Sequence, residues 1–137
     1  MPSKEELQQK LMLYQLLQGQ LEDIRKQATM LQEQFSDIES SRQSLEDISK
    51  LTEARETLIP VGNGVFAHAS LKKGTVLVNV GAGVLIKKTP EEATAILNQK
   101  IQDVEKLTEG LQKEANGYIM KLQELGQELI AESQKKQ

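Results

Sequence analysis

Two features of the sequence could carry chemistry: a glycine-rich phrase and a single histidine. Residues 62 to 67, Gly-Asn-Gly-Val-Phe-Ala, match the Gly-x-Gly-x-x-Ala pattern of dinucleotide-binding loops. In those loops the glycine turn opens a helix, and the pyrophosphate binds at the N-terminus of that helix. Here the residues after the turn favour a strand that ends in Lys72-Lys73-Gly74, so we interpret the phrase as the turn of a β-hairpin.

The histidine is His68, and the chain has no cysteine. A metal site or a histidine-based catalytic group would need companion side chains, and residues 58 to 88 contain no acidic residue. The carboxylates of the flanking segments fall at solvated helical positions. We therefore expect no catalytic residue, no metal and no cofactor. The chain is expected not to be an enzyme, and His68 to be a packed or interfacial side chain.

The glycine phrase occurs twice, once at residues 61–65 (Val-Gly-Asn-Gly-Val) and once at residues 80–84 (Val-Gly-Ala-Gly-Val). Glycine reaches positive φ easily and valine favours extended backbone, so each copy predicts the tip of a hairpin. Their apolar side chains would point to both faces, and two hairpins cannot bury both faces alone. We therefore expect another chain to cover them, which makes the protein an obligate oligomer. The predicted strands are at about 58–61, 65–69, 75–80 and 84–88.

Long helices are predicted on both sides of these strands, from about Glu5 to Leu58 and from Thr89 to about Glu132. Apolar residues recur in each with alternating spacings of three and four, which is typical of a coiled coil. Thr89, Pro90 and Glu92 form the start signal of the second helix, a capping box. The predicted seam positions are Leu7, Tyr14, Leu21, Ala28, Phe35, Leu17, Ile24, Leu31, Ile38 and Leu45 in the first helix, and Leu97, Val104, Leu111, Tyr118, Leu125, Ile101, Thr108, Ala115, Leu122 and Leu129 in the second.

The two apolar stripes can cover each other most simply if the helices fold back antiparallel. The predicted fold class is therefore α+β, with an antiparallel coiled-coil hairpin of two helices joined by two tandem β-hairpins. We expect one domain over residues 1–137. It would consist of a first coiled-coil helix (1–57), a β-hairpin region for oligomerisation (58–88) and a second coiled-coil helix (89–137).

Composition and charge fit long solvated helices better than a globular core. Only 38% of the 137 residues are hydrophobic, and tryptophan is absent. The net charge is −3, which gives no general attraction to nucleic acid. No apolar run approaches the roughly 20 residues that span a bilayer, and the first residues, Met-Pro-Ser-Lys-Glu-Glu, lack the profile of a signal peptide. We expect a soluble, cytoplasmic protein without a membrane partner.

The ends of both helices carry apolar residues beyond the seam. Tighter packing or a fraying terminus would account for them. A functional alternative is an exposed, adaptable surface that binds varied or non-native partners. The off-seam residues are Leu11, Met12, Leu13 and Leu16 in the first helix and Ile119, Met120 and Ile130 in the second.

The layout resembles the alpha-class subunits of archaeal prefoldin. The resemblance is most specific from Leu58 to Ala93, where LIPVGNGVFAHASL and VLVNVGAGVLIKKTPEEA stand between two long helices. It implies an ATP-independent chaperone in which two alpha and four beta subunits join through a double β-barrel made of their hairpins. Six coiled coils would then hold unfolded polypeptide near their tips and pass it to a group II chaperonin.

The resemblance also implies which residues do this work. Client contact would involve Leu7, Leu11, Met12, Leu13, Tyr14, Leu17, Tyr118, Ile119, Leu122, Leu125 and Leu129. Assembly would involve Val61, Val65, Phe66, Val76, Leu77, Val78, Val80, Val84, Leu85 and Ile86.

Two other functions remain open at this stage. A prefoldin-like structural subunit could assemble with itself into homo-oligomers or filaments through the same hairpins. Nucleic-acid binding would depend on Lys72, Lys73, Lys87 and Lys88, and four lysines without interleaved aromatic residues are weak support for it.

Overall fold

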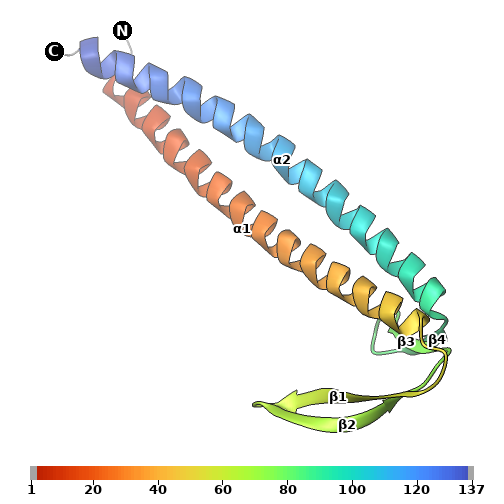
Figure 1. Ribbon diagram of the computed structural model, residues 1–137. Helices are drawn as coiled ribbons and strands as arrows, with labels where there is room; N and C mark the ends of the chain where they lie inside the picture. Colours follow the sequence, from red (N-terminus) through yellow and green to blue (C-terminus); the bar gives the residue numbers. More distant parts are fainter. Residues whose placement is uncertain (1–2, 136–137) are drawn as a thin grey trace. The chain divides into compact units, whose positions relative to one another are not determined.

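The computed structural model describes residues 3–135 and contains two long helices with two small antiparallel hairpins between them (Figure 1). The predicted α+β fold is therefore confirmed. The chain divides into two compact units, which are described separately. The terminal unit comprises residues 1–34 and 103–137, and the hairpin unit comprises residues 35–102. The elements are α1 (Lys4–Ser49), β1 (Arg55–Gly62), β2 (Val65–Leu71), β3 (Val76–Asn79), β4 (Leu85–Lys88) and α2 (Pro90–Lys135).

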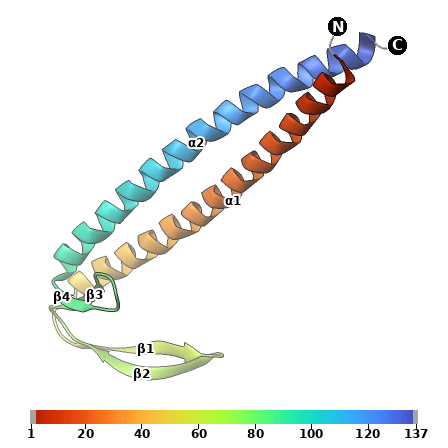
Figure 2. The same cartoon turned by 180° about the vertical axis from the view of Figure 1, so that it is seen from behind.

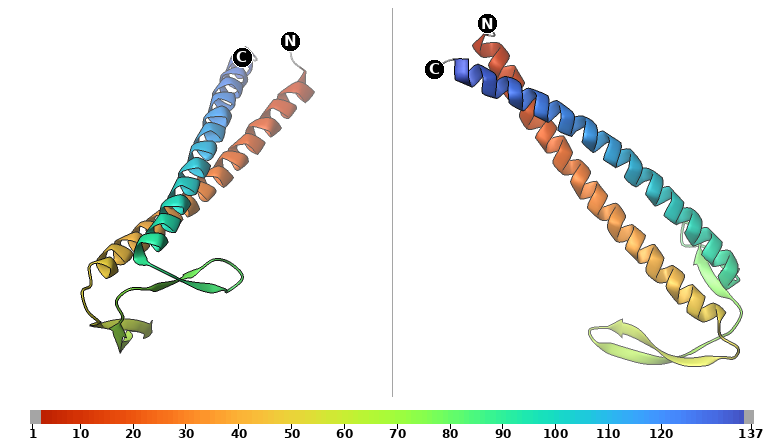
Figure 3. Two further views of the ribbon diagram at one scale, coloured as in Figure 1. Left: turned by 90° about the vertical axis from the view of Figure 1, so that its right-hand side faces the viewer. Right: turned by 45° about the horizontal axis from the view of Figure 1, so that its top comes forward.

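In the terminal unit, α1 and α2 run antiparallel, with the start of α1 beside the end of α2 (Figure 3). Leu17, Leu21 and Ile24 of α1 and Val104 of α2 are the best covered side chains, at 6 to 8% exposure. The other predicted seam positions of this unit are half-buried, with the exception of Thr108. Thr108 is exposed, and its hydroxyl donates a hydrogen bond to the Val104 carbonyl at 2.8 Å. The hydrogen bond to the preceding turn of α2 therefore satisfies the Thr108 hydroxyl. The heptad pattern thus predicted the seam well.

In the hairpin unit, the seam continues through half-buried Phe35, Ile38, Leu45 and Leu97 to the buried Ile101. Arg42 interrupts the apolar track of α1, and it is half-buried rather than excluded from the seam. Its Nη1 donates to Asn98 Oδ1 of α2 at 3.0 Å, and its Nη2 donates to Glu39 Oε2 at 3.1 Å. These hydrogen bonds satisfy the Arg42 guanidinium at the position where this apolar track of α1 is interrupted.

Both helices begin with a side-chain cap. At α2 the predicted capping box is present, because the Glu92 N–H donates to Thr89 Oγ1 at 3.1 Å and the Thr89 N–H donates to Glu92 Oε1 at 3.2 Å. The hydrogen bonds with the backbone and then the side chain of Thr89 hold the pKa of Glu92 below its ordinary value. At α1, Ser3 Oγ accepts from the Glu6 N–H at 3.2 Å, a cap that the sequence reading missed.

The first helix ends at Ser49 and not near Leu58, so its predicted C-terminal boundary is wrong. The Leu51 N–H donates to the Ile48 carbonyl in a tight last turn, and β1 begins at Arg55. Arg55 pairs with Leu71, which places Leu58 in a strand opposite His68. Backbone pairing between β1 and β2 competes with continuation of the helix and determines where α1 ends. The heptad pattern carries no information about this pairing.

The two hairpins are separate two-stranded sheets (Figure 2). Their residues pair in the same register. Leu58 pairs with His68 in the first, and Leu77 pairs with Lys87 in the second, an offset of 19 residues on every strand. The turns repeat as well. Residues 62, 63 and 64 have φ of 116°, 51° and 78°, and residues 81, 82 and 83 have φ of 119°, 52° and 74°. The duplicated phrase therefore encodes a duplicated structure, as the sequence predicted.

Each hairpin has one half-covered face and one open face. Ala67, Ala69 and Leu71 are half-buried on the first hairpin, and Val76 and Val78 occupy the corresponding face of the second. The opposite faces are exposed throughout. They carry Leu58, Pro60, Phe66 and His68 in the first hairpin and Leu77, Asn79, Leu85 and Lys87 in the second.

Candidate functional site

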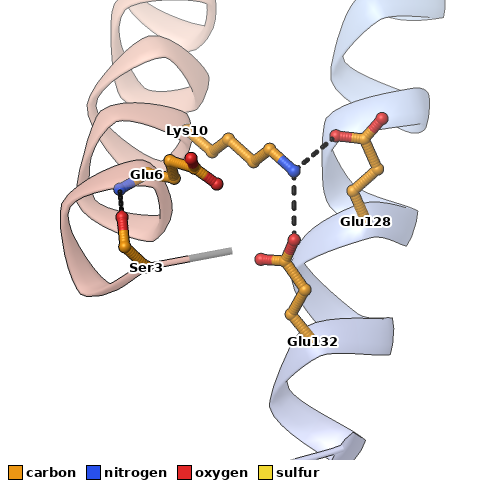
Figure 4. Close-up of polar contacts among 5 residues, drawn as sticks. All are labelled: Ser3, Glu6, Lys10, Glu128 and Glu132. Atoms are coloured by element: carbon orange, nitrogen blue, oxygen red, sulfur yellow. Dashed lines mark hydrogen bonds and ion pairs between the residues drawn. The ribbon is translucent and has the colours of Figure 1, made fainter. Parts of the chain in front are cut away.

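The terminal unit contains a small ion-pair cluster between the two helices (Figure 4). Lys10 Nζ of α1 lies 3.0 Å from Glu132 Oε1 and 3.3 Å from Glu128 Oε2 of α2. Hydrogen bonds to Glu132 and then Glu128 raise the pKa of Lys10. Glu132 Oε2 is buried and accepts no hydrogen bond from the residues that the structure describes. This cluster links the start of α1 to the end of α2 and pairs the ammonium of Lys10 with two carboxylates.

One turn further along α1, the ring of Tyr14 lies against Gly126 of α2. A Cβ built on Gly126 would lie 3.7 Å from Tyr14 Cε2, an ordinary van der Waals distance. The half-buried ring lies close to the backbone of α2, with room for a methyl group at residue 126. Tyr14 therefore closes the seam between the ion-pair cluster and the buried Leu17.

A group of large apolar side chains surrounds this closed seam on its solvent side. Residues 7 to 21 of α1 contain a single charged residue, Lys10, whose ammonium is held by the two glutamates. The other side chains of this segment of α1 are therefore apolar or uncharged polar. We call this group the terminal apolar surface, and its members, with their exposed fractions, are Leu11 (48%), Met12 (69%), Leu13 (45%), Leu16 (58%), Ile119 (36%), Met120 (70%) and Ile130 (61%).

The residues predicted for client contact fall into three groups. Leu11, Met12, Leu13 and Ile119 are exposed members of the terminal apolar surface. Leu17 is 6% exposed and belongs to the seam. The remaining six are half-buried beneath the surface: Leu7, Tyr14, Tyr118, Leu122, Leu125 and Leu129. Client contact at these residues stays a prediction.

Three exposed residues of the terminal apolar surface were absent from the predicted client set: Leu16, Met120 and Ile130. Their sequence signal is the same one that identified Leu11 and Ile119, an apolar residue at a helical position that does not belong to the seam. The heptad pattern already places all three off the seam, so the same rule applied to every apolar residue would have included them in the client set.

The hairpins form a second candidate site, for assembly. Of the ten residues predicted for oligomerisation, Val76 and Val78 are half-buried, and the others are 42 to 59% exposed. Leu58 and Ile59 of β1 add to this apolar area at 55% and 46% exposure. Two-stranded sheets with this much open apolar surface are marginal alone, which supports the expectation of a partner.

Neither hairpin turn has the geometry of a nucleotide site. Gly62, Asn63 and Gly64 lead into β2 and not into a helix, so no helix N-terminus is available for a pyrophosphate. His68 is exposed on β2, and no group of three or more His, Cys, Asp or Glu residues within 3–135 could hold a metal ion. In the same described range, no helix is both long and apolar enough to cross a membrane.

The arrangement defines a class of protein: two coiled-coil helices with a pair of β-hairpins between them. A model of the prefoldin family, described as "Prefoldin subunit", matches residues 17–135. The chain belongs to the prefoldin family. This is a family of chaperones whose subunits form oligomeric complexes with one another, and it is not a known enzyme family.

Curated relatives narrow the assignment to the alpha class. "Prefoldin subunit alpha 1" of Methanocaldococcus jannaschii is 32% identical over 133 residues, which cover 97% of this chain and 92% of the relative. "Prefoldin subunit alpha" of Archaeoglobus fulgidus is 27% identical over 136 residues, which cover 98% and 99%. The resemblance to archaeal alpha subunits is thereby confirmed, and the chain is a prefoldin chaperone subunit.

A solved structure supports the fold. A chain in the cryo-EM structure of filamentous PFD from Methanocaldococcus jannaschii superposes with a TM-score of 0.73, over 82% of this chain and 93% of that one. Its sequence identity is 21%, so it bears on the fold alone.

Proposed function

We propose that the chain is the alpha-type subunit of a cytoplasmic, ATP-independent holdase that binds unfolded or nascent polypeptide at its terminal apolar surface. The observation that carries the proposal is the exposure of that surface: seven large apolar side chains are 36 to 70% exposed beside a closed seam. An apolar patch that its own seam does not need marks a binding surface. Two methionines within it add flexible, polarizable contact that suits varied clients.

We propose further that the hairpins join this chain to beta-type prefoldin subunits, two alpha with four beta, in an intersubunit β-barrel. The support is the open apolar area on both hairpins and their shared register. Strands whose faces and edges are open add readily to strands of another chain. Transfer of the client to a group II chaperonin is the last step that the family resemblance implies, and co-sedimentation of the loaded complex with such a chaperonin tests it.

The proposed holdase function is tested on the complex of this chain with a beta-type prefoldin subunit. A chemically denatured client is diluted into the complex without ATP, and its aggregation is followed by light scattering. The triple variant L11Q/L13Q/L16Q removes exposed apolar area and leaves every predicted seam residue unchanged. We expect it to bind client roughly tenfold more weakly, the size of effect that losing the burial of one or two such side chains produces.

A matched control is M30Q/L107Q. These side chains are 65% and 59% exposed in the same unit, but they lie outside the terminal apolar surface. The control variant should suppress aggregation as the natural sequence does. Equal suppression by the triple variant and the natural sequence would refute binding at the terminal apolar surface.

A second candidate is self-assembly into homo-oligomers or filaments through the hairpins. It is favoured by the open hairpin faces and by the filamentous assembly named for the structural neighbour. Light scattering of the chain alone separates the candidates. A large, polydisperse species would support self-assembly, whereas a small oligomer that becomes a hexamer when the beta-type subunit is added would support the holdase.

A further inference from the structure

The methionine side chains provide an unassigned set of reactive groups. Met12, Met30 and Met120 are 69%, 65% and 70% exposed, so their sulfur atoms are open to solutes. The chain has no cysteine, so its methionine thioethers are the sulfur groups available for oxidation. Two of them, Met12 and Met120, belong to the terminal apolar surface, whereas Met30 lies outside it.

Met12 and Met120 occupy equivalent outward positions on the two helices. Met12 lies two residues from Lys10 and from Tyr14, and at 3.6 residues per turn it points about 160° away from both. Met120 stands in the same relation to Tyr118 and Leu122, both half-buried in the seam. A side chain in such a position does not pack in the seam, so its apolar character is not needed for the helix pair.

Elsewhere in the terminal unit, the same outward heptad positions hold residues without an apolar side chain. The thioethers are therefore an exception in a row of polar and glycine residues. The row consists of Glu5, Gly19, Lys26 and Glu33 on α1 and of Lys106, Lys113, Gln127 and Gln134 on α2.

We propose that Met12 and Met120 are oxidation sites, at which a peroxide converts the terminal apolar surface from a client-binding to a weakly binding state. The inference rests on the proposed holdase function. In the reaction the methionine sulfur attacks one peroxide oxygen, an S–O bond forms and the O–O bond breaks. The sulfur loses two electrons, the peroxide is reduced, and its second oxygen leaves as water or an alcohol after taking up a proton. The product is methionine sulfoxide.

The sulfoxide replaces a flexible apolar group with a strongly polar one, which a client can no longer desolvate at low free-energy cost. Because neither side chain packs in the seam, the helix pair keeps its structure when it is oxidised. Reduction by a methionine sulfoxide reductase would restore the thioether and the binding surface. Met30 is similarly exposed and should also be oxidised. Its oxidation should not weaken client binding, because Met30 lies outside the terminal apolar surface.

The test uses the complex of this chain with its beta-type partner, before and after treatment with hydrogen peroxide. Three readouts are taken: peptide mass spectrometry for the oxygen added at each methionine, circular dichroism for helix content, and binding of a denatured client. The variant M12L/M120L is compared with M30L, and each variant is compared with itself before and after peroxide. This comparison cancels oxidation of the partner subunits, which is common to all samples.

For the natural sequence, one oxygen should be added at each of Met12, Met30 and Met120, helix content should stay constant, and client affinity should fall roughly tenfold. M30L should lose affinity to the same extent, and M12L/M120L should lose little. M12Q/M120Q, which introduces polar groups without oxidation, should bind weakly before treatment. Equal losses in M12L/M120L and M30L, or unchanged affinity when Met12 and Met120 are fully oxidised, would overturn the proposal. If the untreated complex holds no client at all, the proposed holdase function itself fails.

Discussion

Lys10 and Glu132 form an ion pair of 3.0 Å at positions where the heptad pattern of each helix calls for an apolar residue. Lys10 lies seven residues before Leu17, and Glu132 lies seven residues after Leu125. Opposite charges within an apolar seam add little net stability, but they are satisfied only in the alignment that brings them together. We therefore expect the pair to set the register of the two helices in the terminal unit.

The first prediction concerns this pair. Lys10→Leu leaves the Glu132 carboxylate half-buried without its cation, so the variant should melt at a lower temperature than the natural sequence. The double variant K10L/E132L should regain or exceed the natural melting temperature, because two apolar side chains then replace the ion pair at these seam positions. Thermal unfolding followed by circular dichroism measures both, with Lys121→Leu as a control at an exposed position of α2. A double variant that melts no higher than the single variant would show that the unpaired Glu132 carboxylate is not what destabilises Lys10→Leu.

The capping box of α2 predicts a pH dependence. The pKa of Glu92 is depressed by its hydrogen bonds with Thr89, so the folded state favours the carboxylate. A group with a depressed folded-state pKa contributes stability above its ordinary pKa of 4.5, and that contribution is lost as the pH falls through the depressed value. Glu92→Ala should therefore melt below the natural sequence at neutral pH, and the difference should shrink as the pH is lowered past 4.5. A difference that stays constant down to full protonation would contradict a contribution from the charged Glu92 carboxylate.

A third prediction uses the contact between Tyr14 and Gly126. A Cβ at residue 126 would meet Tyr14 Cε2 at 3.7 Å without a clash, so Gly126→Ala should stabilise the protein by about 1 kcal/mol through helix propensity. Gly117→Ala is the control, because a Cβ at residue 117 faces open space and the substitution gives the same gain in helix propensity. Thermal unfolding should show similar gains for the two variants. A loss of stability at residue 126 alone would mean that the ring needs closer contact with the backbone.

One substitution in the second hairpin turn should make that turn more stable. Ala82 has φ of 52°, in the left-handed region that disfavours a side chain, whereas the equivalent residue of the first turn is Asn63 at 51°. Ala82→Gly should relieve about 1 kcal/mol of backbone strain. The amide of Val84, which donates to the Gly81 carbonyl at 3.0 Å, should then exchange its hydrogen more slowly. Ala67→Gly, in β2 of the first hairpin, should leave the exchange of the Val84 amide unchanged. Faster exchange in Ala82→Gly would contradict the assigned strain.

Regular, strongly periodic features of this protein could be predicted from the sequence. The seam residues, the capping box at Thr89 and the two turns follow from local rules, because spacing in helices and glycine in turns act through the nearest neighbours. The end of α1 could not be predicted in this way. Leu58 continues the heptad pattern, but its backbone pairs with His68 in a strand. The spacing of apolar residues along a helix does not reveal such pairing between strands.

The ion-pair cluster was missed for a different reason. A search for apolar periodicity passes over Lys10 and Glu132, although both occupy seam positions, because it treats charged residues as interruptions. Their partnership appears only when the two helices are aligned, since the residues are far apart in the chain. The same holds for Arg42, whose partner Asn98 lies on the other helix.

The measurement that tests the central claim most directly is photo-crosslinking from the surface of α1 to a bound client. A photoreactive residue is placed at Met12 or, in the control, at Glu33, which points away from the seam in the same way and lies about 30 Å further along the helix. Each variant is assembled with its beta-type partner, loaded with a denatured client and illuminated. The account predicts client crosslinks from residue 12 and few or none from residue 33. Equal crosslinking from the two positions, or crosslinking from residue 33 alone, would contradict client binding at the terminal apolar surface.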